Sequence, residues 1–201
     1  MKNAMIYIHG KGGTAAEAAH YQPLFAHSDV IGFDYKAQTP WEAKAEFSQF
    51  FDAVQENHET VSIIASSIGA FFALNGFLDK PVKSAHFISP VVNMEQLIAD
   101  MMEWANVTEE ELRVRREIKT ALGETLSWNY LCYVREHPIT WQVPTRILYG
   151  EKDHLTAYET MLAFAKKTGA EITVMDGGEH WFHTGEQMAF LDRWIRQVDK
   201  I

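Results

Sequence analysis

Short apolar runs alternate with longer segments of helical periodicity along most of this chain. The predicted strands are Ala4–Ile8, Val30–Asp34, Val61–Ala65, Ser84–Ile88, Thr145–Tyr149 and Glu171–Met175. The predicted helices are Thr14–His27, Trp41–Glu56, Ile68–Leu78, Ala157–Lys167 and Gly185–Asp199. Several strands are continuously apolar, which indicates burial on both faces. The alternation therefore predicts an α/β fold with a mostly parallel six-stranded sheet flanked by helices.

Residues 93–141 interrupt this alternation with about three helical patterns and no convincing strand. One of these helices opens at Thr108, with Glu111 placed to complete a capping box. The 201-residue chain suits one domain, so we expect a single domain, 1–201, with 93–141 as a helical cap inserted after the fourth strand. Loops at the carboxyl edge of such sheets often build the pocket. A long crossover packed on the sheet flank is the alternative.

The segment from Val61 to Leu74 predicts a strand, a sharp turn and a buried helix. A nucleophilic serine on such a turn needs small residues two positions before and two after it. Ser67 meets this need with Ala65 and Gly69. Ser66, the alternative nucleophile, is flanked at the same spacing by two bulky isoleucines. The pattern favours Ser67.

A second signal comes from the first predicted strand, which ends in His9-Gly10 and is followed by Lys11-Gly12-Gly13. Glycines let the backbone turn so that an N–H can face a substrate oxygen. We expect an oxyanion hole made by the backbone N–H groups of Lys11 and Ile68, the latter at the start of the helix after Ser67. A phosphate-binding loop is the competing interpretation, but both usual glycine spacings for it are missing.

These segments resemble the α/β-hydrolase family, specifically its small single-domain members. The likeness is carried by His9-Gly10, Ala65-Ser66-Ser67-Ile68-Gly69, Tyr149-Gly150-Glu151-Lys152-Asp153 and Gly177-Gly178-Glu179-His180. The resemblance implies a Ser, Asp, His order, hydrolysis of acyl compounds and a cap between the later strands. Two departures are Ala65 in place of glycine and a sheet that lacks the first two strands of the family.

The resemblance also implies the catalytic partners of the serine. His180 follows a glycine turn and precedes the last helix, where the family carries its general base; His183 is the rival. Asp153 follows the fifth predicted strand, where a carboxylate would orient the base. Glu151 and Asp176 remain alternatives for the acid.

The substrate pocket is predicted less sharply. Trp104 and Trp128 are the leading candidates from the aromatic-rich insertion, if it covers the site, and plain core packing is their alternative. His9 and His183 complete the predicted pocket, His183 as a neighbouring or substrate-contacting residue three positions after His180.

Composition narrows the classes of function. A net charge of −9 argues against nucleic-acid binding, and one cysteine, Cys132, excludes an intrachain disulfide. Neither a metal-ligand spacing, a signal peptide nor a membrane span is recognised, so we expect no metal, no cofactor and a cytoplasmic location. The sequence predicts a serine hydrolase, of carboxylesterase or thioesterase type, that cleaves a small-molecule acyl ester or thioester through an acyl-enzyme on Ser67. A ligand-binding or signalling protein with little turnover is the alternative.

Overall fold

The chain divides into two compact units. The computed structural model describes residues 2–121 and 123–198. The sheet unit comprises the described residues up to Val92 and from Thr140 onward, and the insertion unit comprises those between Asn93 and Ile139.

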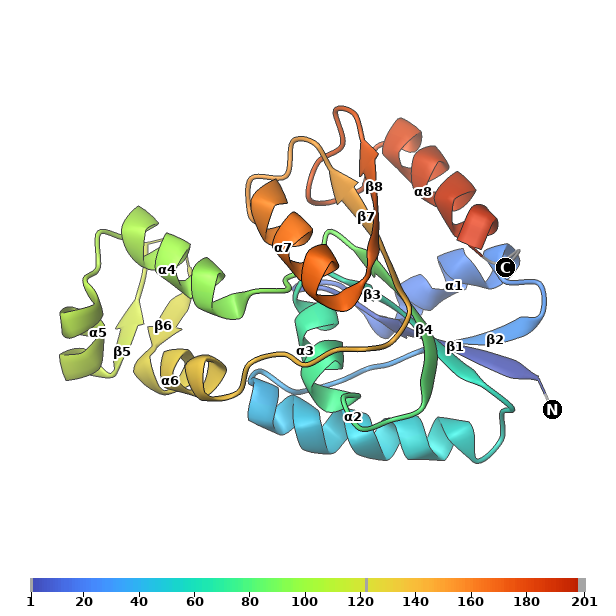
Figure 1. Ribbon diagram of the computed structural model, residues 1–201, viewed down its shortest axis with the longest axis horizontal. Helices are drawn as coiled ribbons and strands as arrows, with labels where there is room; N and C mark the ends of the chain where they lie inside the picture. The colour runs from blue at the N-terminus through green and yellow to red at the C-terminus, as the bar shows by residue number, and fades with distance from the viewer. Residues whose placement is uncertain (1, 122, 199–201) are drawn as a thin grey trace. The chain divides into compact units, whose positions relative to one another are not determined.

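A six-stranded sheet forms the centre of the sheet unit (Figure 1). Its strands are β1 (Asn3–Ile8), β2 (Ser28–Gly32), β3 (Val61–Ser66), β4 (Val82–Ile88), β7 (Thr145–Gly150) and β8 (Glu171–Met175). They lie in the order β2-β1-β3-β4-β7-β8, and every neighbouring pair is parallel. The predicted α/β class and six-stranded sheet are confirmed.

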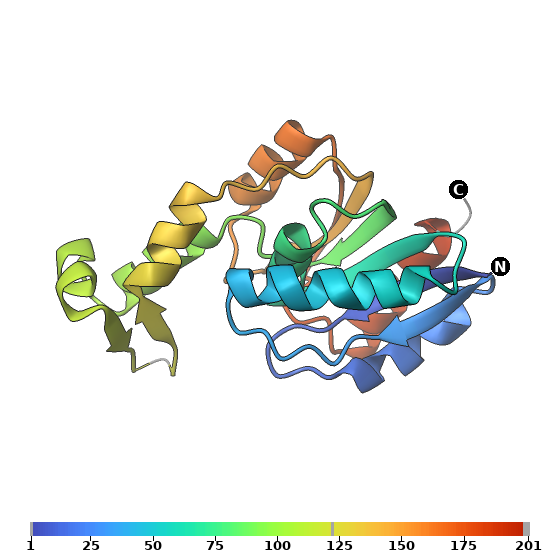
Figure 2. The same ribbon diagram turned by 90° about the horizontal axis from the view of Figure 1, so that it is seen from below.

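The helices of this unit cover both faces of the sheet. They are η1 (Ala15–Glu17), α1 (Ala18–Tyr21), η2 (Gln22–Leu24), α2 (Pro40–Gln55), α3 (Ile68–Gly76), α7 (Tyr158–Thr168) and α8 (Gly185–Val198). The connection from β1 leads to β2, toward one edge of the sheet, whereas the connection from β3 leads to β4, toward the other edge. Right-handed crossovers therefore put α1 and α2 on opposite faces. The helices α3 and α7 lie on the same face as α2, and α8 lies beside α1 (Figures 1 and 2). The point of reversal, between the carboxyl ends of β1 and β3, is where such sheets bind ligands.

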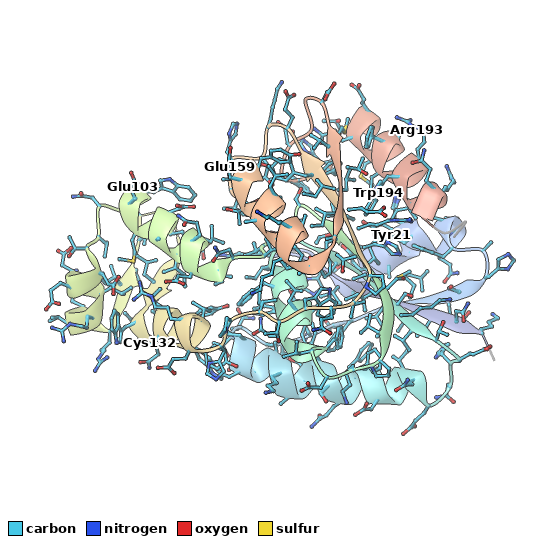
Figure 3. The ribbon with its side chains drawn as sticks, in the orientation of Figure 1. Tyr21, Glu103, Cys132, Glu159, Arg193 and Trp194 are labelled. Carbon is cyan, nitrogen blue, oxygen red and sulfur yellow. The ribbon has the colours of Figure 1, made fainter. Side chains whose placement is uncertain are left out.

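Each face has its own apolar core. Tyr21 of α1 and Trp194 of α8 belong to one buried cluster that extends over the inner strands (Figure 3). On the other face aromatic rings predominate. The ring of Phe47 on α2 packs edge-on to that of Phe33, with centroids 4.8 Å apart, and its centroid lies 5.3 Å from that of Phe77. These clusters hold the strand ends, and the loops that follow them, in fixed places.

The segment predicted as one helix, Thr14–His27, is three short pieces, η1, α1 and η2. Pro23 has no N–H to continue the hydrogen-bond ladder. The Gln22 side chain instead bonds to β2, accepting from the Val30 N–H at 3.0 Å and donating to the Ser28 carbonyl. The predicted strand Val30–Asp34 accordingly lies two residues earlier, as β2. Asp199, the predicted end of the last helix, lies outside the described residues.

The insertion unit is not wholly helical. Its elements are α4 (Met94–Trp104), α5 (Glu109–Arg115), β5 (Glu117–Lys119), β6 (Thr125–Ser127) and α6 (Trp128–Glu136), with β5 and β6 forming an antiparallel pair. Strands of three residues are too short to produce a readable periodicity, which explains why none was expected. The capping box is confirmed, since the Glu111 carboxylate accepts the Thr108 N–H at 2.8 Å.

The insertion ends two residues earlier than predicted. Trp141 belongs to the sheet unit, where its indole N–H donates to Thr145 Oγ1 at 2.8 Å. Within the part of the chain that the structure describes, no helix combines the length and the apolarity needed to cross a lipid bilayer.

Candidate active site

The turn between β3 and α3 holds Ser67 in an unusual backbone conformation. Its φ of 50° and ψ of −123° lie in a region that residues other than glycine rarely adopt, which costs about 1–3 kcal/mol. The Ser67 N–H donates to the Ile88 carbonyl at 3.0 Å, and its own carbonyl accepts from Val91. The sheet therefore maintains a strained turn that projects this side chain from the carboxyl edge.

Gly69 explains why the turn tolerates only small residues near the serine. A Cβ at this position would lie 2.3 Å from the His9 carbonyl oxygen, far inside van der Waals contact. The helix that follows Ser67 is thus pressed against the end of β1. Ala65, fully buried in β3, meets the same requirement two positions before the serine.

Ser67, His180 and Asp153 form one hydrogen-bonded chain. Ser67 Oγ lies 2.8 Å from His180 Nε2, and His180 Nδ1 lies 2.7 Å from Asp153 Oδ2. An ionised carboxylate only accepts, so Nδ1 carries the proton and Nε2 is left to accept from the serine hydroxyl. This arrangement is suited to removing a proton from Ser67.

Asp153, the predicted acid, is held by its own loop. Asp153 Oδ1 accepts the backbone N–H groups of Leu155 and Thr156 at 2.8 and 3.1 Å, and Oδ2 accepts the Thr156 hydroxyl. Its side chain is completely shielded from solvent, whereas that of His180 is 23% exposed. The carboxylate is rigid and the imidazole faces the solvent-accessible side.

Close backbone packing joins the loops that carry Asp153 and His180. A Cβ at Gly150, the last residue of β7, would lie 2.6 Å from the Gly178 carbonyl oxygen. The Lys152 N–H also donates to Gly178 O at 2.7 Å. Glycine at both positions lets the loop after β7 meet the loop after β8.

The alternative acids and base have other partners. The Glu151 carboxylate accepts the Gly177 N–H at 2.8 Å and so holds the turn before His180. Asp176 is exposed. The His183 ring stacks on Trp181 with centroids 4.7 Å apart, and its Nδ1 lies 2.7 Å from the Trp181 carbonyl oxygen. Of the candidates, Asp153 is the one that contacts His180.

The loop after β1 lies directly beside the serine. A Cβ at Gly10 would be 3.2 Å from Ser67 Cβ. Gly10 to Gly13 form a turn in which the Gly13 N–H donates to the Gly10 carbonyl at 3.1 Å, and Gly12 adopts a φ of +77°. Ile68 is the first residue of α3, where a backbone N–H has no acceptor within the helix. Lys11, one residue after Gly10, and Ile68, one residue after Ser67, thus both belong to backbone close to the serine.

A cavity of about 800 Å³ opens beside Ser67. Its walls come from the sheet unit and consist of Tyr7, Gly10, Lys11, Gly12, Gly13, Glu17, His20, Tyr21, Ser66, Ser67, Ile88, Leu155, His180, Trp181, Phe182, His183, Met188 and Leu191. Lys11 and His183, both predicted near the substrate, are part of this wall.

The other predicted pocket residues lie elsewhere or are not placed. In the part of the chain that the structure describes, His9 is not among the residues that line the cavity. Its ring stacks on Tyr35, whose hydroxyl donates to the His9 carbonyl at 2.9 Å. His9 therefore packs on the loop after β2. Trp104 and Trp128 belong to the insertion unit, and their contact with substrate stays a prediction.

Sequence reasoning missed the polar wall formed by Tyr7, Glu17 and Tyr21. Burial raises the pKa of Tyr7 and Tyr21 well above the usual range, so both phenols stay protonated. The Tyr7 hydroxyl donates to the Glu17 carboxylate. The spacing from Thr14 to Glu17, a capping-box pattern directly after the glycine loop, was the available signal.

Among the described residues, no group of three or more His, Cys, Asp or Glu side chains is arranged to hold a metal ion.

Comparisons with known proteins give a fold but no close relative. The sequence matches no protein-family model and no curated protein. Est1E from Butyrivibrio proteoclasticus is similar in structure, with a TM-score of 0.79, 16% identity and coverage of 98% of this chain and 86% of that one. Alpha/beta hydrolase domain-containing protein 10 from mouse has a TM-score of 0.74 and 18% identity, with coverage of 98% of this chain and 89% of that one. ClbQ from the colibactin pathway has a TM-score of 0.62 and 13% identity, with coverage of 100% of this chain and 96% of that one. The chain has the α/β-hydrolase fold.

Proposed function

We propose that this protein is a serine hydrolase that cleaves a carboxylic ester or related acyl compound through an acyl-enzyme on Ser67. The observation that carries the proposal is the hydrogen-bonded chain from Ser67 through His180 to Asp153 at the wall of a cavity. Its three members come from three different strand ends.

In the acylation step, His180 Nε2 takes the Ser67 hydroxyl proton while Oγ bonds to the acyl carbon. The carbonyl π electrons move to oxygen and form a tetrahedral oxyanion. When this intermediate collapses, the bond to the leaving alcohol breaks and the imidazolium returns its proton to that oxygen. Asp153 stabilises the imidazolium and holds its orientation throughout.

Deacylation repeats the sequence with water. His180 removes a proton from a water molecule that attacks the acyl carbon, and the second intermediate expels Ser67 with its proton restored. The product is a carboxylic acid. Both intermediates bear an oxyanion, for which the backbone N–H groups of Lys11 and Ile68 are the proposed donors.

The walls of the cavity suggest an apolar acyl or alcohol group. Ile88, Leu155, Met188 and Leu191 contribute aliphatic surface, and Phe182 is aromatic. Est1E has been solved with ferulic acid bound. Aromatic acyl esters therefore belong in a substrate panel beside aliphatic esters and thioesters.

A fluorophosphonate probe tests the nucleophile. We expect labelling of the wild-type protein, loss of labelling in Ser67→Ala and persistence of labelling in the matched Ser66→Ala variant. Labelling that survives in Ser67→Ala and disappears in Ser66→Ala contradicts the assignment.

Turnover of a panel of p-nitrophenyl esters and acyl thioesters tests the activity itself. Hydrolysis of at least one member, abolished by Ser67→Ala, supports the hydrolase. A protein that is labelled but turns over no member across acyl chain lengths favours the ligand-binding alternative.

A further inference from the structure

Glu17 does more than a capping residue requires. Among the described residues, three Thr-x-x-Glu capping boxes are formed, which begin at Thr14, Thr39 and Thr108. In each, a glutamate accepts the threonine backbone N–H, at 3.0 Å for Glu17. The first box introduces a 3-10 helix of only three residues, and its glutamate also accepts the hydroxyl of a tyrosine on a strand.

That tyrosine, Tyr7, is fixed in place. Its side chain is buried, and its ring stacks on Tyr21 with centroids 4.9 Å apart and planes 29° apart. Because its phenol stays protonated, Tyr7 is the donor and Glu17 the acceptor. One carboxylate oxygen of Glu17 thus binds strand β1, and the other binds Thr14, the residue after the glycine loop.

The glycine loop lies between this carboxylate and the serine. A Cβ at Gly13 would be 2.8 Å from Glu17 Oε1, and a Cβ at Gly10 would be 3.2 Å from Ser67 Cβ. The turn between these glycines includes Lys11. The Glu17 carboxylate therefore packs against the turn that carries the Lys11 peptide.

We propose that Glu17 is a positioning residue: its carboxylate bridges Tyr7 and Thr14 and thereby holds the Lys11 N–H where the oxyanion forms. This inference rests on the proposed hydrolase function. Glu17 acts through the loop and needs no contact with the reacting atoms.

The test compares Glu17→Gln with Glu42→Gln, which alters the matched box at the start of α2. Glu42 accepts the Gln38 and Thr39 N–H groups at 2.9 and 3.0 Å and does not line the cavity. An amide has a single acceptor oxygen, so Glu17→Gln loses one of two bonds that use different carboxylate oxygens. The two bonds of Glu42 share Oε2 and can both persist in Glu42→Gln. Steady-state kinetics with the best ester of the panel and thermal unfolding midpoints are measured for both.

We expect Glu17→Gln to lower kcat about 10- to 100-fold, less than the loss of an entire oxyanion donor, with KM within about twofold of wild type. Glu42→Gln should leave kcat unchanged. Tyr7→Phe, which leaves the bond to Thr14, should lower kcat less than Glu17→Gln, and the double variant should be no slower than Glu17→Gln alone, since both changes break the same bridge.

One result overturns the inference while the hydrolase proposal stands: an active wild type whose Glu17→Gln variant keeps its kcat, whether or not that variant loses thermal stability. A wild type without turnover or labelling contradicts the hydrolase proposal instead. Should Glu17→Gln fail to fold, Tyr7→Phe decides the question by the same split between kcat and KM.

Discussion

Ser67 Oγ lies 2.8 Å from His180 Nε2, although 113 residues separate the two along the chain. One side chain follows the third strand of the sheet and the other follows the last. Parallel strands end at the same edge of a sheet, so the fold brings these loops together and leaves fine positioning to the turns.

Asp153→Asn should lower kcat by about 10⁴-fold with little loss of stability. Asparagine Oδ1 can still accept the Leu155 and Thr156 N–H groups, while its amide replaces the oxygen that faces His180. The amide donates to Nδ1 and forces the ring proton onto Nε2, where it opposes deprotonation of Ser67. Ester hydrolysis is the measurement. The exposed Asp176→Asn variant is the control, and equal losses in the two would contradict the assignment of the acid.

Gly69→Ala should destabilise the protein by about 1–3 kcal/mol, because the added methyl group meets the His9 carbonyl at 2.3 Å. Urea unfolding measures the change. Gly185→Ala is the matched control, since a Cβ there has no atom within 4 Å among those described, and its effect should stay within about 0.5 kcal/mol. Similar effects at both positions would mean that the loop after β1 yields easily.

The buried imidazole of His86 should make the fold sensitive to acid. Burial, with a smaller contribution from the Arg146 charge, lowers the pKa of His86 from 6.5 to about 4. Between those values the unfolded chain binds a proton that the folded protein does not, so stability rises with pH across this window. The loss on going from pH 7 to below pH 4 is about 3 kcal/mol from this group.

His86→Met should remove that part of the pH dependence while keeping an apolar side chain between Phe25 and Trp194. The free energy of unfolding is measured in urea at pH 7 and pH 4.5 for both proteins. If the wild type and the variant lose the same stability over this interval, His86 is not the buried neutral group described.

Trp104→Ala and Trp128→Ala test whether the insertion unit contributes to the substrate pocket. Removing an aromatic contact with a long acyl chain should raise KM for long-chain esters about tenfold and leave acetate esters unaffected. Exposed Trp41→Ala on α2 is the control. Equal KM values for long-chain esters in all four proteins would argue that the unit has no role in acyl binding.

Much of the fold could be predicted from local pattern. β8 has the bounds expected from sequence, and β1, β3 and β7 differ from their predictions by one residue. Continuous apolar runs report burial on both faces whatever lies beside them. Two regions were not predicted. Over η1 to η2, Pro23 and the hydrogen bonds of the Gln22 side chain prevent the single helix that the periodicity indicates. The β5–β6 pair is too short to show a period.

The candidate site divides in the same way. The prediction of Ser67 follows from the small residues that a sharp turn requires around it, and the predictions of Asp153 and His180 follow from the resemblance to the α/β-hydrolase family. The bridge from Glu17 to Tyr7, the packing of Gly150 on Gly178 and the cavity wall required the tertiary structure. Short-range steric constraints and periodicity act within one segment, so the residues of that segment determine them. Contacts between distant segments depend on the packing of the whole sheet unit, which no single segment encodes.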